Sequence, residues 1–81
     1  EYISLSPEID IMEIALTDKV AGKTVLELDV RKRFGLNIIA VKQEGKLSTE
    51  ILPTTVLSAV DSLTVIGKTE AIHRFENYLQ S

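Results

Sequence analysis

The sequence contains no cysteine and no tryptophan, and it has one histidine and two prolines among its 81 residues. Without cysteine there is neither a disulfide nor a thiolate metal site, and a single histidine argues against a histidine-based zinc site. No apolar run approaches the ~20 residues that a helix needs to span a bilayer, and no signal peptide is visible. The sequence therefore predicts one small domain with no segment inserted in the membrane.

The size of the chain limits its stability. A domain this small buries only about 60% of the surface of its unfolded chain, and domains without disulfides or metals often gain stability by associating. Hydrophobic residues make up 44% of the sequence, which is enough for a core and for an interface.

The charges exclude some partners and some chemistry. Nine basic and twelve acidic residues give a formal charge of −3, and the only basic cluster is Arg31, Lys32 and Arg33. A nucleic-acid binder needs a basic face, so we expect no nucleic-acid polymer as partner. His73 has no carboxylate at a useful spacing, and no nucleophile motif, phosphate-binding loop or metal-ligand spacing occurs. An enzyme is therefore the least favoured interpretation.

The stretch 24–42 has the strongest local signals. Thr24 and Glu27 have the spacing of a capping box, and Gly35 suits a left-handed helix end. The three basic residues 31–33 fall in the last turn, where cations favour the helix dipole. These signals predict a helix over residues 25–34, followed by a strand over residues 36–42.

This helix and this strand have more apolar surface than one core requires. On a helical wheel, Val25 and Leu28 form one arc, while Leu26, Val30 and Phe34 form a second; an ordinary surface helix has a single stripe. The strand is apolar on both faces, as is typical of a strand covered on both sides. A second packing partner explains both patterns, although one wide core face explains the helix equally well.

The remaining elements complete an α+β fold. We expect a strand over residues 9–16 with a bulge near Ile11–Met12, a hairpin from residues 36–42 into a strand at 47–52 that Pro53 ends, and a strand at 62–67. Thr69 is the expected cap of a final helix, and Val56, Leu57 and Val60 are expected to point inward. The order β-α-β-β-β-α predicts a two-layer sandwich with its helices on one face. Residues 1–8 are interpreted as a lead-in from an upstream domain, and residues 9–81 as the domain itself.

Polar residues surround the mouth of an apolar set in the stretch 24–42. Such a surface suits a planar aromatic ligand with a charged linker, because aliphatic side chains sandwich a base, asparagine both donates and accepts, and arginine meets phosphate in a fork. Taken singly, Arg31–Arg33 is more often a solvated helix end, and Asn37 is commonly a residue tolerated after a helix-stopping glycine. The polar residues are Asp29, Arg31 and Asn37, and the apolar ones are Val25, Leu26, Val30, Ile38, Ile39 and Ala40.

Three segments resemble a known family: V-x-G-K-T-V-x-E-L-D-V-R-x-x-F-G-x-N-I-I-A-V-K, then Pro53, then D-S-L-T-V-I-G. They are similar to the C-terminal regulatory domain of potassium-transport gating subunits, called RCK-C or TrkA-C. The segment from Leu28 to Ala40 most resembles the Ktr-type subunits of Gram-positive bacteria. The resemblance covers residues 9–79, and it implies a dimeric TrkA-C-like fold.

The resemblance also implies a ligand. Ktr-type domains bind cyclic di-AMP, which inactivates potassium uptake, in the cleft of a twofold dimer. In this chain the helix 24–34 and the strand 36–42 would form that dimer. Lys46 stands where a family member carries a histidine, and Ala59-Val60-Asp61 stands where the family usually has Gly-Asp. The positions that match the cleft are Val25, Leu26, Asp29, Val30, Arg31, Asn37, Ile38, Ile39, Ala40, Lys46 and Pro53.

The family setting extends beyond this domain. It implies a larger ring in the full-length protein, a membrane potassium-transporter subunit as partner, and a cytoplasmic location at the inner face of the membrane. No cofactor is expected in this domain, since NAD or ATP would bind an upstream nucleotide-binding domain. The alternatives are a pure dimerisation module and a small-metabolite sensor without a cyclic dinucleotide site.

Overall fold

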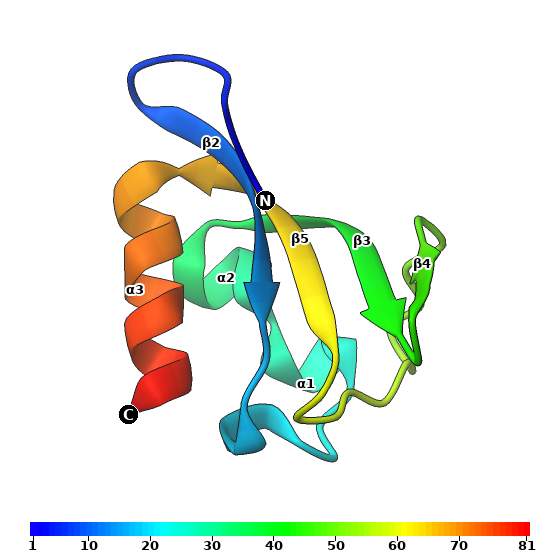
Figure 1. Ribbon diagram of the computed structural model, residues 1–81. Helices are drawn as coiled ribbons and strands as arrows, with labels where there is room; N and C mark the ends of the chain where they lie inside the picture. The colour runs from blue at the N-terminus through cyan, green and yellow to red at the C-terminus, as the bar shows by residue number, and fades with distance from the viewer.

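The computed structural model covers all 81 residues and contains one antiparallel sheet of five strands, in the order β1-β2-β5-β3-β4 (Figure 1). The α+β class and the two-layer sandwich are confirmed. The strands are β1 (Tyr2–Ser4), β2 (Ile9–Ala15), β3 (Asn37–Gln43), β4 (Lys46–Ser48) and β5 (Ser62–Lys68). The helices are the 3₁₀ turn η1 (Asp18–Val20), α1 (Val25–Leu28), α2 (Val30–Phe34) and α3 (Thr69–Gln80). No helix has the length and apolar character needed to cross a membrane.

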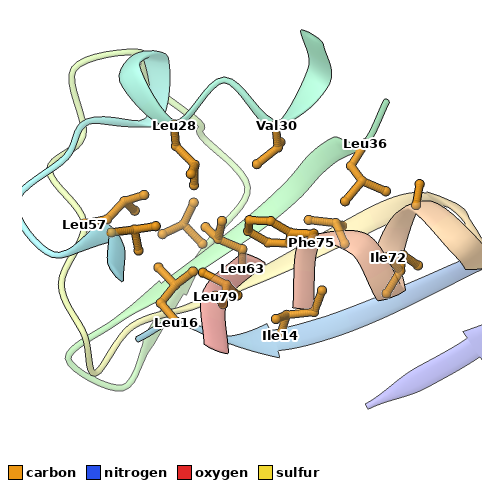
Figure 2. Packing of buried hydrophobic residues seen from close by; sticks show 14 residues of the cluster. Ile14, Leu16, Leu28, Val30, Leu36, Leu57, Leu63, Ile72, Phe75 and Leu79 are labelled. Atoms are coloured by element: carbon orange, nitrogen blue, oxygen red, sulfur yellow. The ribbon is translucent and has the colours of Figure 1, made fainter. Parts of the chain in front are cut away.

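The core lies between one face of the sheet and the helices. Phe75 of α3 sits at its centre, surrounded by side chains from the sheet, from α1 and α2, and from the loop that carries Leu57 (Figure 2). Helix α3 buries a single stripe, formed by Ala71, Ile72, Phe75 and Leu79. The opposite face of the sheet has no helix on it.

The predicted helix over residues 25–34 is wrong in one respect, because it breaks at Asp29. This residue has left-handed dihedrals, φ 50° and ψ 53°, and separates α1 from α2. Its predicted ends are confirmed: Thr24 and Glu27 form the capping box, and Gly35 ends α2 with φ 73°. The break turns both Leu28 and Val30 into the core, with exposed fractions of 0% and 4%. The two apolar arcs therefore reflect a change in helix direction, and of the helix's apolar side chains only Leu26, 68% exposed, clearly lacks a partner.

The first eight residues are more than a lead-in, because they include β1. Ile3 pairs with Ile11, and β1 forms one edge of the sheet. Asp10 of β2 is 2% exposed and accepts hydrogen bonds from the Tyr2 hydroxyl at 3.0 Å and from the Thr69 hydroxyl at 2.6 Å. A buried carboxylate needs such donors, and these two fasten the edge strand and the start of α3 to β2. Thr69 is thus the first residue of α3 rather than its cap.

The bulge predicted in β2 is also wrong. Pairing of β2 with β5 is continuous from Ile9 to Ala15, and the irregularity lies in β3 between Ile38 and Ala40. The apolar residues change from odd to even positions after Ile11 because Asp10, a polar residue, occupies a core-facing position in line with Met12 and Ile14.

The β3–β4 hairpin is confirmed, but β4 is shorter than expected. Glu44 and Gly45 both have positive φ, 51° and 75°, as a tight two-residue hairpin turn requires. Strand β4 ends at Ser48, before Pro53. In the loop that follows, Leu57 is buried as predicted, whereas Val56 is 57% and Val60 90% exposed. The loop is held instead by buried Asp61, whose carboxylate accepts from Gln43 Nε2 at 2.8 Å and from the Ser58 N–H at 2.9 Å.

Candidate functional site

A cleft of about 200 Å³ lies between the α1–α2 break and the start of β3. Six of the eleven residues predicted for the ligand site line it, although they come from three different elements or their junctions. These six are Val25, Asp29, Val30, Arg31, Asn37 and Ile38, and the other two lining residues are Leu36 and Ile51.

The left-handed Asp29 shapes one wall of the cleft. Its N–H donates to the Val25 carbonyl and its carbonyl accepts from the Arg33 N–H, both at 3.0 Å, so the break leaves these backbone groups satisfied. A left-handed L-residue costs about 1–2 kcal/mol, although aspartate tolerates this conformation better than most. With this break, three successive residues line the cleft: acidic Asp29, aliphatic Val30 and basic Arg31.

The opposite wall belongs to the first half of β3. Strand β4 pairs only with Val41–Gln43, so residues 37–40 are a free sheet edge on that side, while their other side pairs with β5. The bulge between Ile38 and Ala40 falls within this stretch. Bulges near binding sites commonly re-aim side chains, and here Ile39 is left 39% exposed.

Two polar side chains of the cleft have no bonding partner within the chain. Arg31 and Asn37 are exposed, and neither side chain makes a hydrogen bond or an ion pair within the chain. Arg33 behaves differently: its guanidinium donates to the Leu28 carbonyl at 3.2 Å and lies 4.4 Å from the ring centroid of Tyr78. The Arg33 guanidinium beside the Tyr78 hydroxyl also lowers the pKa of that tyrosine. Of the basic cluster, Arg33 stabilises the fold, while Arg31 is available to a ligand.

Five predicted site residues lie outside the cleft of one chain. Leu26 and Pro53 are neighbours, since the Leu26 N–H donates to the Pro53 carbonyl at 3.0 Å. Lys46 lines a separate open hollow beside β4. The remaining two, Ile39 and Ala40, follow the cleft along β3 but do not line it.

Sequence reasoning missed Leu36 and Ile51. Leu36 is fully buried, and its position directly after the helix-ending Gly35 was the available signal. Ile51 was assigned to a strand from its alternation with Leu47, but it lies in the loop after β4 and packs against the core. No sequence pattern brings this loop to the cleft, because its approach depends on tertiary packing.

The cleft combines aliphatic walls with a polar rim. Its aliphatic walls suit a flat ring, and its rim offers an amide, a carboxylate and a guanidinium. No cluster of three His, Cys, Asp or Glu side chains gathers to hold a metal ion. His73 lies exposed on α3, away from the cleft residues.

Residues 11–80 match the TrkA-C domain family, so the chain belongs to this family. It is 40% identical over 76 residues to the Ktr system potassium uptake protein C of Bacillus subtilis, and 36% identical over the same length to protein A of that system. Each alignment covers 94% of this chain but only 34% of the relative. The chain thus spans about a third of the length of these relatives.

Solved structures agree with this assignment. The RCK C domain of the potassium transport protein KtrA, in complex with cyclic di-AMP, superimposes with a TM-score of 0.78 at 36% identity, covering 83% of this chain and 79% of that one. The RCK_C domain dimer of BusR from S. agalactiae, also in complex with cyclic di-AMP, gives 0.78 at 26% identity, with 86% and 95% covered. The RCK domain of GsuK gives 0.83 at 30% identity, covering this chain completely and 18% of that one. The resemblance seen in the sequence is therefore confirmed.

Proposed function

We propose that this chain is the regulatory domain of a potassium uptake system and binds cyclic di-AMP in the α1–β3 cleft, between two copies of itself. The observation that carries the proposal is the convergence of Val25, Asp29, Val30, Arg31, Asn37 and Ile38 on one cleft whose arginine and asparagine have no partner within the chain. Two structures with the same fold, KtrA and BusR, hold this ligand.

The chemistry of the ligand fits the cleft. Cyclic di-AMP has two adenines and two phosphates, so a twofold dimer offers each half the same surface. Val25, Val30 and Ile38 would pack on an adenine, Asn37 would pair with its polar edge, and Arg31 would contact a phosphate. The cleft of about 200 Å³ is smaller than the roughly 300 Å³ at which small-molecule sites begin, as expected of half a site.

The second copy completes the proposed site. The five predicted residues outside the cleft would then lie at the dimer contact or reach the ligand from the partner. Exposed Leu26 and its neighbour Pro53 suit the apolar contact, and Lys46 adds a cation. These five residues are Leu26, Ile39, Ala40, Lys46 and Pro53.

The wider setting is part of the same proposal. The ligand-binding domain would comprise residues 9–81 together with the edge strand β1, and the segment 1–8 would also join it to an upstream domain that binds NAD or ATP; no cofactor is proposed for the domain described here. The full protein would form a larger ring on the cytoplasmic face of the membrane and bind a potassium-transporter subunit. Cyclic di-AMP would inactivate transport.

Calorimetric titration with cyclic di-AMP tests the proposal. We expect one ligand for every two chains. Arg31→Ala should raise the Kd about tenfold or more, because a hydrogen bond to a charged phosphate contributes roughly 1.5–3 kcal/mol, and Asn37→Ala should raise it by a smaller factor, because a hydrogen bond to neutral adenine contributes roughly 0.5–1.5 kcal/mol. Lys32→Ala is the matched control, since Lys32 neighbours Arg31 but does not line the cleft.

Two outcomes would contradict the proposal. The first is absence of binding, and the second is one ligand per monomer without a dimer. A dimerisation module with an empty cleft would show no heat of binding and an unchanged dimer in Arg31→Ala. A metabolite sensor would instead gain thermal stability from another small molecule in a melting screen.

A further inference from the structure

The face of the sheet opposite the core contains a shallow hollow of about 350 Å³. It lies across all five strands of the sheet, since each strand contributes at least one lining residue. The cleft of the proposed ligand site shares none of its residues. The hollow is lined by Glu1, Ile3, Ile11, Glu13, Lys42, Leu47 and Thr64.

Three of the seven residues that line this hollow are large and apolar. The pairing of β1, β2 and β5 aligns Ile3, Ile11 and Ile66 in one row across the sheet. At the other side of the hollow, Leu47 on β4 is 61% exposed, and Ile3 itself is 55% exposed. A contiguous exposed apolar surface with a polar surround marks an interaction site.

The charges on this face are arranged around Thr64 of the central strand β5. Glu13 pairs with Thr64 on the β2 side, whereas Lys42 lies on the β3 side and pairs with Ser62. Ile3 and Ile11 lie on the same side as Glu13, and Leu47 pairs with Lys42. One side of Thr64 therefore carries an acid and two isoleucines, and the other carries a base and a protruding leucine.

We propose that a second copy of this chain packs on the open sheet face about a twofold axis close to Thr64. A rotation by half a turn exchanges the two sides of the hollow. It sets Glu13 opposite Lys42 of the partner subunit and Leu47 against the isoleucines of the other chain. Both contacts then occur twice, as a self-complementary twofold interface requires.

This interface does not depend on the proposed ligand site. If the α1–β3 cleft also joins two copies, each chain has two twofold surfaces on different parts of its sheet. Chains with two such surfaces can associate beyond a dimer, for example as a tetramer with three mutually perpendicular twofold axes. The open face would thus contribute to the association beyond a dimer.

Charge reversal tests the interface in ligand-free protein. The variants Glu13→Lys and Lys42→Glu each place like charges in both symmetric contacts, so each should reduce the weight-average mass in analytical ultracentrifugation by about half. An equimolar mixture of the two variants places opposite charges in both contacts, so the original mass should return. If either substitution lowered the mass only by disturbing its own chain, mixing the two variants would not restore the original mass.

Leu47→Asp gives a second, apolar test. It should lower the mass as the charge reversals do, whereas the control Val60→Asp, at a residue that is 90% exposed and outside the hollow, should not. Melting curves verify that each variant is folded. The proposal is overturned if the wild-type chain is a monomer, if the three open-face variants keep its mass, or if mixing restores nothing. Failure of cyclic di-AMP to bind would leave these results unaffected.

Discussion

Helix α3 and the pair α1–α2 pack on the same face of the sheet, yet they differ in regularity. Helix α3 runs unbroken for 12 residues and buries a single stripe. The pair α1–α2 is interrupted by a left-handed residue, leaves Leu26 exposed, and presents an unpaired Arg31 at a cleft. The two regions meet where Phe34 packs on Phe75, with ring centroids 5.2 Å apart. Departures from local rules often mark a functional site, and here they coincide with the cleft.

The largest effect is expected in the regular region, from Phe75→Ala. Phe75 is fully buried at the centre of the core, and removing such a ring typically costs about 3–5 kcal/mol through lost burial and an unfilled cavity. For a domain this small, that loss is most of the total stability. Urea denaturation followed by circular dichroism measures it.

A matched change on the exposed side of α3 serves as the control. Glu76→Ala should leave the denaturation midpoint nearly unchanged, because Glu76 makes no side-chain hydrogen bond or ion pair and lies outside the buried stripe. If Glu76→Ala and Phe75→Ala lowered the denaturation midpoint equally, the buried stripe of α3 would not be what stabilises the core.

Gly67→Ala connects the two regions. A Cβ at Gly67 would lie 2.5 Å from Leu36 Cδ2 and 3.3 Å from the Gly35 carbonyl oxygen. Leu36 is fully buried and also lines the cleft, so it must shift there. We expect a loss of roughly 1–3 kcal/mol from overpacking, together with weaker cyclic di-AMP binding.

Two measurements on Gly67→Ala separate these effects. Chemical denaturation reports stability, and calorimetry reports the Kd of the folded variant. The double variant Gly67→Ala/Leu36→Val should recover part of the stability, because the shorter side chain makes room for the added methyl. If it does not, the clash with Leu36 is not the cause.

The α1–α2 break is tested by Asp29→Ala and Asp29→Gly. Alanine in the left-handed region costs about 1–2 kcal/mol, whereas glycine adopts it freely. We therefore expect thermal unfolding to show Asp29→Ala less stable than Asp29→Gly by about that amount. If alanine proves the more stable of the two, residues 25–34 form the continuous helix that the sequence predicted.

The elements that could be predicted are those specified by neighbouring residues. Thr24, Glu27 and Gly35 set the helix ends through contacts within a few positions, and the stripe of α3 follows from its own periodicity. The break at Asp29 could not be predicted, because it depends on burying Leu28 and Val30 together against the distant core. Likewise, nothing local to Asp10 reveals that Tyr2 and Thr69 supply its donors.

The candidate site was predictable to a similar extent. The family resemblance and the unusual apolar surface point to seven residues between positions 25 and 38, and all of them except Leu26 share one cleft. Ile51 was missed because the loop that carries it reaches the cleft only through tertiary packing. Lys46 was included through sequence correspondence, but the short β4 holds it in a separate hollow of this chain.

The smallest effect concerns the start of α1 and its dependence on pH. The Glu27 carboxylate accepts hydrogen bonds from the Thr24 N–H at 2.9 Å and from the Thr24 hydroxyl at 3.2 Å. These bonds, the backbone one first, lower the pKa of Glu27 below its ordinary value of 4.5. The unfolded chain thus binds more protons than the folded chain near this pH, so the free energy of unfolding rises with pH there.

The stabilisation by charged Glu27 is complete above pH 4.5 and is lost as the pH falls through the lowered pKa. Thr24→Ala removes both of its side-chain contacts and should cost about 1 kcal/mol at neutral pH. It should also flatten this part of the pH profile in part, since the Thr24 hydroxyl no longer donates to Glu27 while the larger contribution of the residue 24 N–H remains. Urea denaturation of both proteins between pH 3 and pH 7 measures the difference, and Thr24→Ser should retain the wild-type slope because serine caps equally well. A parallel profile for Thr24→Ala would mean that the Thr24 hydroxyl does not contribute to the acid sensitivity of the α1–α2 region.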